Sequence, residues 1–160
     1  MTIAVGDRLP DVEFRRMGPK GEEVMRTADL FAGRKVALFG VPGAFTPTCH
    51  NMHVPDFLAR AEELGSKGVD AIICVSVNDV FVMDAWSRTF GDDHALLFMS
   101  DWNAAFARAT GLAVDRGATL GVRISRFSML VDDGVVTAMH IEDGPGKIEA
   151  TGAANLMMAL

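Results

Sequence analysis

Two nearly continuous apolar runs, at residues 36–41 and 69–76, are the clearest pattern in the sequence. Runs of this length and composition are typical of strands that are covered on both faces of a sheet. Between them, apolar residues stand at the i, i+3, i+4 and i+7 spacing of a helix, namely Val54, Phe57, Leu58 and Ala61. We expect this helix to end near Gly65 and Gly68. A strand–helix–strand unit crosses over with a right hand, so we expect the two strands to be parallel.

Shorter patterns add strands at the margins of this unit. Apolar positions at 12–14 and 24–26 surround a breaker-rich turn, which predicts an edge hairpin. A second hairpin is predicted at 128–131 and 135–140, around an Asp-Asp-Gly turn. The other predicted elements are a helix at 79–90, a strand at 95–99 and a closing helix at 150–160. The pattern therefore predicts an α/β fold with a central mixed β-sheet flanked by helices.

Composition limits the class of protein. We expect residues 1–160 to form a single domain, because no repeat, low-complexity tract or linker interrupts the apolar segments. No apolar run approaches the roughly 18 residues that suggest a membrane span. A formal net charge of -6 disfavours nucleic acid and anionic membranes as partners. The first residues show neither a secretory nor a transit pattern, so we expect a cytoplasmic location.

The segment 40–50 places a cysteine between the first central strand and the helix that follows it. Ligands of open α/β sheets bind at the carboxyl ends of strands, and a proline such as Pro47 is tolerated just inside a helix start. Thr46 is then the expected N-cap, and Cys49 lies in the first turn, whose free N–H groups favour a thiolate. A thiolate that attacks a hydroperoxide becomes a sulfenic acid, which a second thiol can reduce. The segment therefore fits a peroxidase cycle.

The residues around Cys49 resemble the active-site signature of the peroxiredoxin family. Pro42, Thr46 and Cys49 stand at the spacing Pro-x-x-x-Thr-x-x-Cys, and the whole run at 41–49 is similar to the version found in the type II, or fifth, subfamily. The resemblance extends over nearly the whole chain, through residues 74–79, Trp86 and residues 126–134.

This resemblance implies a thioredoxin-like fold and a role for each residue of the signature. Cys49 would be the peroxidatic nucleophile, Thr46 its hydroxyl partner and Pro42 the residue that shields the pocket. The cation beside the sulfur would be Arg126, which immediately precedes a predicted strand, although Arg123 is close enough to remain an alternative. The resemblance further implies a homodimer that needs no metal, flavin or nucleotide cofactor. Whether it prefers hydrogen peroxide, alkyl hydroperoxides or peroxynitrite stays open.

The second cysteine does not match a resolving cysteine. Some members of the subfamily carry one near the C-terminus, but the matching stretch at 147–152 has none. Cys74 lies in a predicted buried strand, where a cysteine is usually a small core residue. The chain thus resembles the one-cysteine members, which are recycled by an external thiol such as glutathione, glutaredoxin or thioredoxin.

Two other classes of function remain as alternatives. A cysteine hydrolase or acyltransferase would also need an activated thiolate, with a histidine base and an orienting group. A thioredoxin-like binding or chaperone module could use Cys49 only to sense oxidants. His50 and His53 near Cys49 lack the paired ligands of a structural zinc site, so we expect no metal. His53 could tune the thiolate or merely bond locally.

Overall fold

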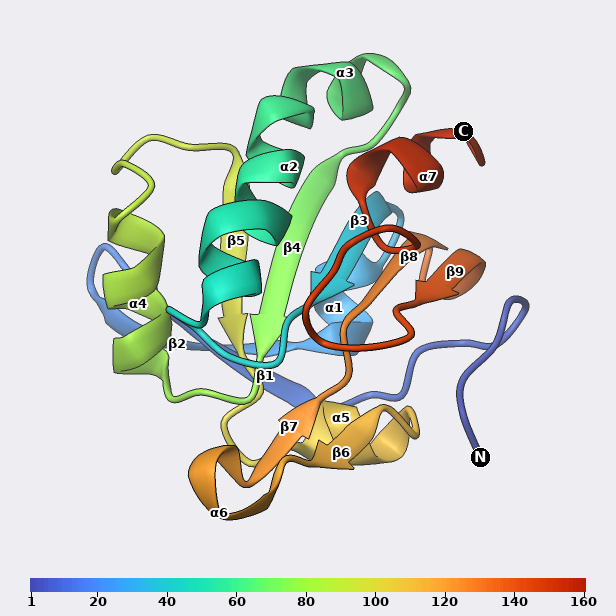
Figure 1. Cartoon of the computed structure of the whole chain (residues 1–160). Coiled ribbons are helices and arrows are strands. Elements are labelled where there is room, and N and C mark those ends of the chain that lie inside the picture. Colours follow the sequence, from blue (N-terminus) through green and yellow to red (C-terminus); the bar gives the residue numbers. More distant parts are fainter.

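A seven-stranded mixed sheet forms the centre of the computed structural model, which describes residues 1–160 (Figure 1). The strand order is β2-β1-β5-β4-β3-β8-β9, in which β3, β4 and β5 are parallel and the hairpins at both edges are antiparallel. The strands are β1 (Glu13–Gly18), β2 (Gly21–Arg26), β3 (Lys35–Gly40), β4 (Ala71–Ser76), β5 (Leu96–Ser100), β8 (Phe127–Asp132) and β9 (Val135–Ile141). Both predicted hairpins and the parallel central pair are confirmed.

Helices cover both faces of this sheet, as the alternation of side chains along β3 shows. Ala37 and Phe39 belong to one buried cluster, whereas Val36 and Leu38 belong to the other. The first cluster includes side chains of α2 (Val54–Ala59), α3 (Ala61–Ser66), α4 (Val80–Arg88) and α7 (Ala153–Met157). The second includes side chains of α1 (Thr27–Phe31) and α5 (Ala105–Ala109). The predicted α/β fold is therefore confirmed. None of the helices is both long enough and apolar enough to cross a membrane.

Two predicted helices differ from the observed ones. The helix after Cys49 breaks at Arg60, which leaves helical geometry with φ -109° and ψ 8° and separates α2 from α3. The closing helix, expected at 150–160, covers only Ala153–Met157. It begins late because Gly152 is extended and the N–H of Ala153 donates to Asp56 Oδ2 of α2, at 2.7 Å. A carboxylate at a helix start satisfies N–H groups that lack an intrahelical partner.

A small region after β5 was not predicted from the sequence. It contains the two-stranded sheet of β6 (Ala113–Asp115) and β7 (Val122–Ile124), with α6 (Gly117–Leu120) between them. Elements of three or four residues are too short to show a hydrophobic period. In Figure 1 this region lies at the lower end of the molecule, below the carboxyl end of β4.

Strand register brings the ends of distant segments together at that end of the sheet. Gly40 of β3 pairs with Phe127 of β8, so Arg126 lies next to the loop that leaves β3. A Cβ atom at Gly40 would collide with the ring of Phe127, which explains why glycine stands in this buried strand. The loop between β9 and α7, in red in Figure 1, folds back toward the same end of β8.

Candidate functional site

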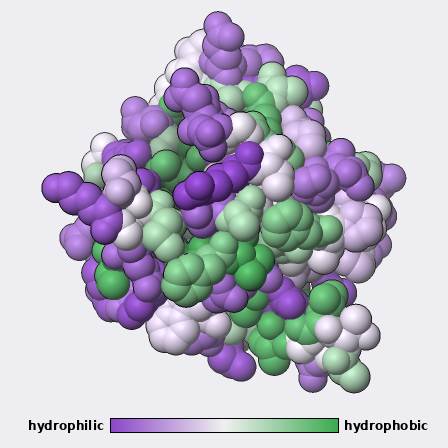
Figure 2. Space-filling view, turned by 90° about the vertical axis from the view of Figure 1, so that its left-hand side faces the viewer, coloured by the Kyte–Doolittle hydropathy of each residue, from purple (hydrophilic) through white to green (hydrophobic).

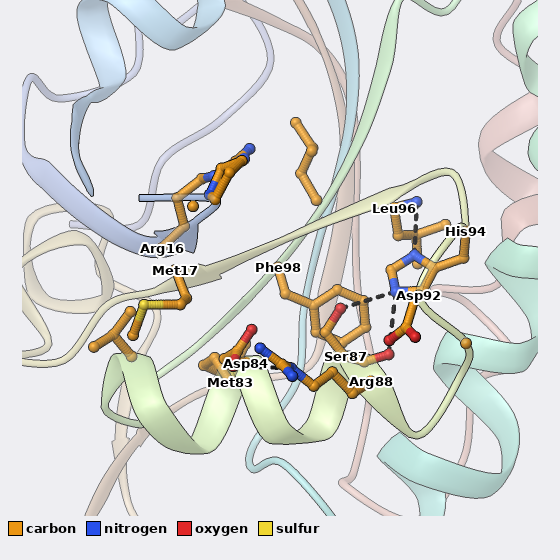
Figure 3. Close-up of a pocket in the computed structure, with 15 residues that line it drawn as sticks. Arg16, Met17, Met83, Asp84, Ser87, Arg88, Asp92, His94, Leu96 and Phe98 are labelled. Atoms are coloured by element: carbon orange, nitrogen blue, oxygen red, sulfur yellow. Dashed lines mark hydrogen bonds and ion pairs between the residues drawn. The ribbon is translucent and has the colours of Figure 1, made fainter. Parts of the chain in front are cut away.

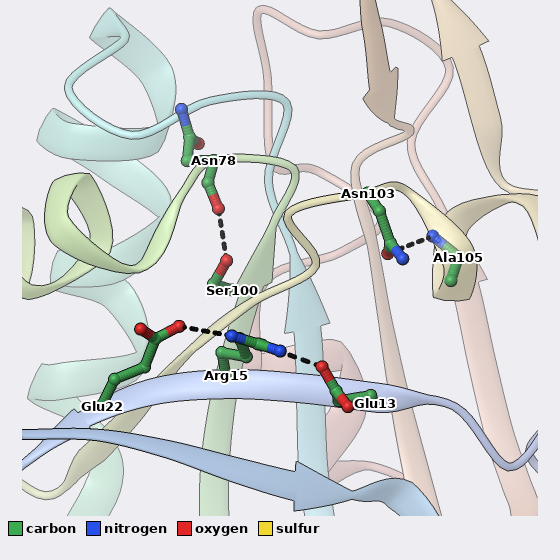
Figure 4. A network of polar contacts seen from close by, with 7 residues as sticks. All are labelled: Glu13, Arg15, Glu22, Asn78, Ser100, Asn103 and Ala105. Atoms are coloured by element: carbon green, nitrogen blue, oxygen red, sulfur yellow. Dashed lines mark hydrogen bonds and ion pairs between the residues drawn. The ribbon is translucent and has the colours of Figure 1, made fainter.

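The loop that leaves β3 is held by the end of β4. The hydroxyl of Ser76 donates to the carbonyl oxygen of Val41 at 3.1 Å, and the N–H of Ala44 donates to Asn78 Oδ1 at 3.0 Å. Asn78 is itself tied to the sheet, because its carbonyl oxygen accepts a hydrogen bond from the hydroxyl of Ser100 (Figure 4). Figure 4 also shows Arg15 of β1, which forms one ion pair with Glu13 of the same strand and another with Glu22 of the neighbouring strand β2. Hydrogen bonds therefore tie the loop to the carboxyl ends of β4 and β5.

Helical structure begins at Pro47, as predicted, but from its third residue it continues as a π-helix, η1 (Cys49–His53). The N–H of His50 donates to the carbonyl oxygen of Thr46 at 2.9 Å, which is the backbone behaviour of an N-cap. The N–H of Val54 then donates to the carbonyl oxygen of Cys49, one residue farther than in an α-helix. Single π-turns of this kind are frequent at functional sites.

The π-turn carries His53 into the core. Its side chain is fully buried, and its ring centroid lies 4.8 Å from that of Phe39. His50 instead accepts a hydrogen bond at Nδ1 from the indole of Trp86, at 2.9 Å. The two histidines of the π-turn therefore contact different residues, His53 the ring of Phe39 and His50 the indole of Trp86.

Arg126 is the cation beside the sulfur. Its Nη2 atom lies 3.1 Å from Cys49 Sγ, and both side chains are buried, with 2% and 1% of their surface exposed. Arg123 lies elsewhere, since its guanidinium donates to the carbonyl oxygens of Leu120 and Val77 at 2.8 and 3.0 Å. Of the two arginines considered from the sequence, only Arg126 contacts Cys49.

His53 and Pro145 hold the guanidinium of Arg126 in place. Arg126 Nη1 lies 2.8 Å from His53 Nδ1, and its Nε and Nη2 atoms donate to the carbonyl oxygen of Pro145 at 3.3 and 2.9 Å. His53 Nε2 lies 3.0 Å from the carbonyl oxygen of Thr151. A neutral imidazole with its hydrogen on Nε2 satisfies both contacts, because Nδ1 can then accept from Arg126.

Burial keeps that imidazole neutral. Desolvation first, and the positive charge of Arg126 second, lower the pKa of His53 from 6.5 to about 3. His53 is thus an uncharged support for Arg126 rather than a base. Its position was left open by the sequence, because the π-turn that buries it has no sequence pattern of its own.

Glu142 organises the loop that supplies Pro145 and Thr151. Its Oε1 atom accepts the N–H of Ala150 at 2.9 Å, and the N–H and hydroxyl of Thr151 at 3.1 and 3.0 Å. Burial alone would raise the pKa of Glu142, but these hydrogen bonds outweigh it and lower the pKa below its usual value. Contacts therefore run from Glu142 through Thr151, His53 and Arg126 to Cys49. In the sequence, the start of this loop is typical only of a turn.

A small cavity of about 250 Å³ opens onto Arg126. Its lining residues are Pro42, Thr46, Pro47, Thr48, Arg116, Leu120, Arg126, Pro145 and Gly146. The predicted site residues Pro42, Thr46 and Arg126 are thus brought together beside Cys49. The Thr46 hydroxyl donates to the carbonyl oxygen of Gly43 at 2.6 Å, and no hydrogen bond joins it to Cys49 Sγ. Its expected contact with the sulfur is therefore absent from this structure.

A larger cavity, of about 490 Å³, lies away from Cys49 between α4, β5 and the β1–β2 turn (Figure 3). There His94 Nε2 lies 2.8 Å from the hydroxyl of Ser87, while His94 Nδ1 accepts the N–H of Leu96 at 3.2 Å. His94 therefore carries its hydrogen on Nε2 and cannot take a proton from Ser87 at that atom. The pair does not have the arrangement of a hydrolase nucleophile and its base.

Comparison with known proteins assigns the family. The Redoxin family model matches residues 4–157. Peroxiredoxin-2B from Arabidopsis thaliana is 45% identical over 160 residues, which cover 99% of this chain and 98% of that protein. The chain belongs to the type II peroxiredoxins. The structure of reduced Prx3 from Vibrio vulnificus in complex with hydrogen peroxide matches this peroxiredoxin with a TM-score of 0.94 and 40% identity, over 99% of both chains. The thioredoxin-like fold and the thiol-dependent peroxidase activity are confirmed.

The expected cytoplasmic location is wrong, because the comparison with curated relatives points to chloroplastic proteins. Peroxiredoxin-2E-2 from Oryza sativa subsp. japonica, a chloroplastic protein, is 47% identical over 165 residues, which cover 99% of this peroxiredoxin and 73% of that protein. The chloroplastic peroxiredoxin-2E of Arabidopsis thaliana is 43% identical over 164 residues. Compartment is specified by targeting segments and not by the folded domain. The expectation had rested on the pattern of the first residues, and the folded domain itself carries no signal for the compartment.

The second cysteine of the peroxiredoxin is part of the core. Cys74 is fully buried in β4, pairs in register with Phe39 and Phe98, and makes no disulfide. Burial raises its pKa well above the usual value, and the nearby sulfur of Cys49 adds to the effect. A thiol in this environment is a poor nucleophile.

Proposed function

We propose that Cys49 is the peroxidatic nucleophile of this peroxidase, with Arg126, Thr46 and Pro42 completing its active site. The observation that carries the proposal is the 3.1 Å contact between Arg126 Nη2 and Cys49 Sγ, in surroundings where both side chains are almost fully buried. A guanidinium at that distance stabilises a sulfur anion, and a buried charge pair acts more strongly than an exposed one.

The reaction transfers one oxygen atom to the sulfur. The thiolate of Cys49 attacks the terminal oxygen of the hydroperoxide, an S–O bond forms, and the O–O bond breaks. The bonding electrons leave with the other oxygen, which takes up a proton and departs as alcohol or water. Cys49 is thereby oxidised to a sulfenic acid.

Arg126 has a hydrogen-bond donor left for the peroxide. Hydrogen bonds to Cys49, His53 and Pro145 use its Nε–H, both Nη2 hydrogens and one Nη1 hydrogen. The second Nη1 hydrogen is free to bind the oxygen on which charge develops as the O–O bond breaks. The same guanidinium would thus form hydrogen bonds with both the attacking sulfur and the departing oxygen.

Thr46 and Pro42 complement that donor. Because the hydrogen of the Thr46 hydroxyl is donated to Gly43, its oxygen can serve an incoming ligand only as an acceptor. It therefore suits the hydrogen of a hydroperoxide and would orient the molecule for attack. Pro42 is buried, lines the cavity and keeps water from the sulfur.

We propose a one-cysteine cycle that uses no prosthetic cofactor and ends with an external thiol. Cys74 is buried in the sheet, and no other cysteine is present to resolve the sulfenic acid. A thiol attacks the sulfenic acid, an S–S bond forms and water leaves, and a second thiol releases Cys49. Glutathione, glutaredoxin and thioredoxin are the reductants that this cycle admits.

We further propose that residues 1–160 form a single domain that assembles as a homodimer. The two buried clusters share the same central sheet, which supports a single folding unit. Phe81 on α4 and Phe45 in the loop that leads to Cys49 are 67% and 50% exposed, and apolar surface on the α4 side is visible in Figure 2. Exposed aromatic side chains are typical of protein–protein interfaces. The net charge of -6 disfavours nucleic acid as a partner.

The decisive experiment compares two cysteine variants. Reduced wild type, Cys49→Ser and Cys74→Ser are each treated with one equivalent of hydrogen peroxide, sulfenic acid is trapped, and the adduct is mapped by mass spectrometry. We expect an adduct on Cys49 in the wild type and in Cys74→Ser, and peroxide turnover in the same two proteins. Labelling of Cys74, or equal loss of turnover in both variants, would contradict the proposal. Oxidation without turnover by any thiol would favour a sensing module, and ester hydrolysis an acyl-transfer enzyme.

A further inference from the structure

The cavity that opens onto Arg126 has one charged group without a role in the reaction described above. Only two of its lining residues are charged, Arg116 and Arg126. Arg126 already forms hydrogen bonds with Cys49, His53 and Pro145. The remaining walls are largely apolar and include three prolines and Leu120. Arg116 is therefore the one charged lining residue whose side chain has no role in the reaction.

Arg116 has no partner within the chain. Its Nε atom is buried and unbonded, and no ion pair involves its side chain. Arg16 also has a buried Nε without a hydrogen bond, but Glu23 lies 3.4 Å from it. The acidic neighbour of Arg116, Asp115, uses Oδ1 to accept the N–H of Gly117 at 2.8 Å. A partly buried guanidinium without a counter-charge is unfavourable unless a ligand supplies one.

The backbone fixes the position from which this side chain reaches. The N–H of Arg116 donates to the carbonyl oxygen of Gly121 at 2.8 Å, and Gly117 has a φ of 75°, which favours glycine. The base of the side chain is therefore anchored while its donors stay available. A guanidinium with free donors binds a carboxylate through two parallel hydrogen bonds.

We propose that Arg116 binds the carboxylate of an organic co-substrate that enters this cavity to react at Cys49. The inference rests on the proposed function and names the chemical class that the site selects. Arg126 engages the reacting atoms, the proline and leucine walls contact the aliphatic part, and Arg116 holds the carboxylate. The cavity, of about 250 Å³, has room for a small organic group.

Two co-substrates of the cycle can carry this carboxylate. One is the hydroperoxide, which loses an oxygen to Cys49 and leaves as an alcohol with its carboxylate unchanged. The other is the reducing thiol, which displaces water from the sulfenic acid and forms an S–S bond. In both, the carboxylate stays outside the bonds that form and break, so Arg116 contributes binding and orientation and does not stabilise the transferred oxygen.

The test compares wild type, Arg116→Gln and Arg116→Lys with matched probes. The oxidation arm measures the rate constant of Cys49 oxidation by hydrogen peroxide, by a short alkyl hydroperoxide with a terminal carboxylate, and by its methyl ester. The reduction arm measures the reduction of the sulfenic acid by mercaptopropionate and by its methyl ester. The ester controls add one methyl group to each probe and remove its charge.

We expect Arg116→Gln to slow reaction with the carboxylate probe by about 10- to 100-fold in one arm, with hydrogen peroxide and the esters unchanged. Arg116→Lys should retain part of the preference. The arm that responds identifies the source of the carboxylate. Equal rates for acid and ester in the wild type, or equal losses for all probes in Arg116→Gln, would overturn the inference. A wild type that hydrogen peroxide does not oxidise at Cys49 would instead overturn the proposed function.

Discussion

Arg126 and His53, which are 73 residues apart in the sequence, lie with Nη1 and Nδ1 only 2.8 Å apart. Their closeness follows from two features of the fold. Antiparallel pairing of β3 with β8 brings Arg126 to the end of β3, and the π-turn η1 directs His53 inward from the following helix. The imidazole thus determines where the guanidinium stands relative to Cys49.

We expect the shape of the guanidinium to matter as much as its charge. Arg126→Lys keeps a positive charge but loses the fork that bonds Cys49, His53 and Pro145 together. Oxidation of Cys49 by hydrogen peroxide should slow by about 10²- to 10³-fold in Arg126→Lys and at least as much in Arg126→Met, as for loss of one oxyanion donor. Stopped-flow tryptophan fluorescence would follow the step, since Trp86 bonds His50 beside Cys49. A rate within a factor of about two of the wild type would remove Arg126 from the mechanism.

Two substitutions of His53 separate its two hydrogen bonds. The amide oxygen of His53→Asn can occupy the place of Nδ1 and accept from Arg126, whereas His53→Gln reaches the place of Nε2 and the carbonyl oxygen of Thr151. If His53 positions Arg126, oxidation of Cys49 should slow by up to about 100-fold in His53→Gln and by less in His53→Asn. Equal rates in the two variants would mean that His53 only fills space.

The buried imidazole also makes the stability of the protein depend on pH. The pKa of His53 is lowered from 6.5 to about 3, so the unfolded chain binds its proton more readily than the folded one. The contribution of the neutral imidazole is therefore fully present above about pH 6.5 and is lost progressively as the pH falls toward 3, with a limiting slope of about 1.4 kcal/mol per pH unit. Urea unfolding between about pH 7 and about pH 5 should show a shallower decline in His53→Asn than in the wild type. Parallel declines would show that His53 does not titrate as described.

The sequence predicted those parts of the fold and site that follow from local patterns. Long apolar runs identified β3 and β4, and the turn after β8 was recognisable because Asp133 and Gly134 are residues that adopt the positive φ seen there, 47° and 81°. The cysteine, threonine and proline of the signature were found because their spacing is specific.

Other parts of the site depend on tertiary contacts. The π-turn at Cys49–His53 needs the packing of His53 against Phe39, which no local pattern reveals. Pro145 acts through its carbonyl oxygen, and every residue has one. The hydroxyl of Thr46 was expected at the sulfur and donates to Gly43 instead, a choice of rotamer that only the folded loop decides.

Glu142 is expected to act on catalysis without touching the cavity. Its Oε1 atom holds Ala150 and Thr151, and the same loop presents the carbonyl oxygens that bind His53 and Arg126. Glu142→Gln keeps a carbonyl oxygen for these donors, whereas Glu142→Ala removes it and leaves them unsatisfied, at about 1–3 kcal/mol of stability. Oxidation of Cys49 should slow in Glu142→Ala and stay near the wild-type rate in Glu142→Gln. Loss of rate in Glu142→Gln alone would point to a role for the negative charge.

Thr46 allows a direct test of the hydroxyl as a peroxide acceptor. Thr46→Val keeps the size of the side chain and removes the oxygen that donates to Gly43 and would accept the peroxide hydrogen, whereas Thr46→Ser keeps it. We expect Thr46→Val to slow oxidation by about 10- to 100-fold and Thr46→Ser to stay close to the wild type. The loss should appear in the oxidation step, in which the hydroxyl oxygen accepts the hydrogen of the hydroperoxide, and should be absent from the reduction of the sulfenic acid by thiol. If reduction slows by the same factor, the hydroxyl supports the loop through Gly43 and does not bind the peroxide.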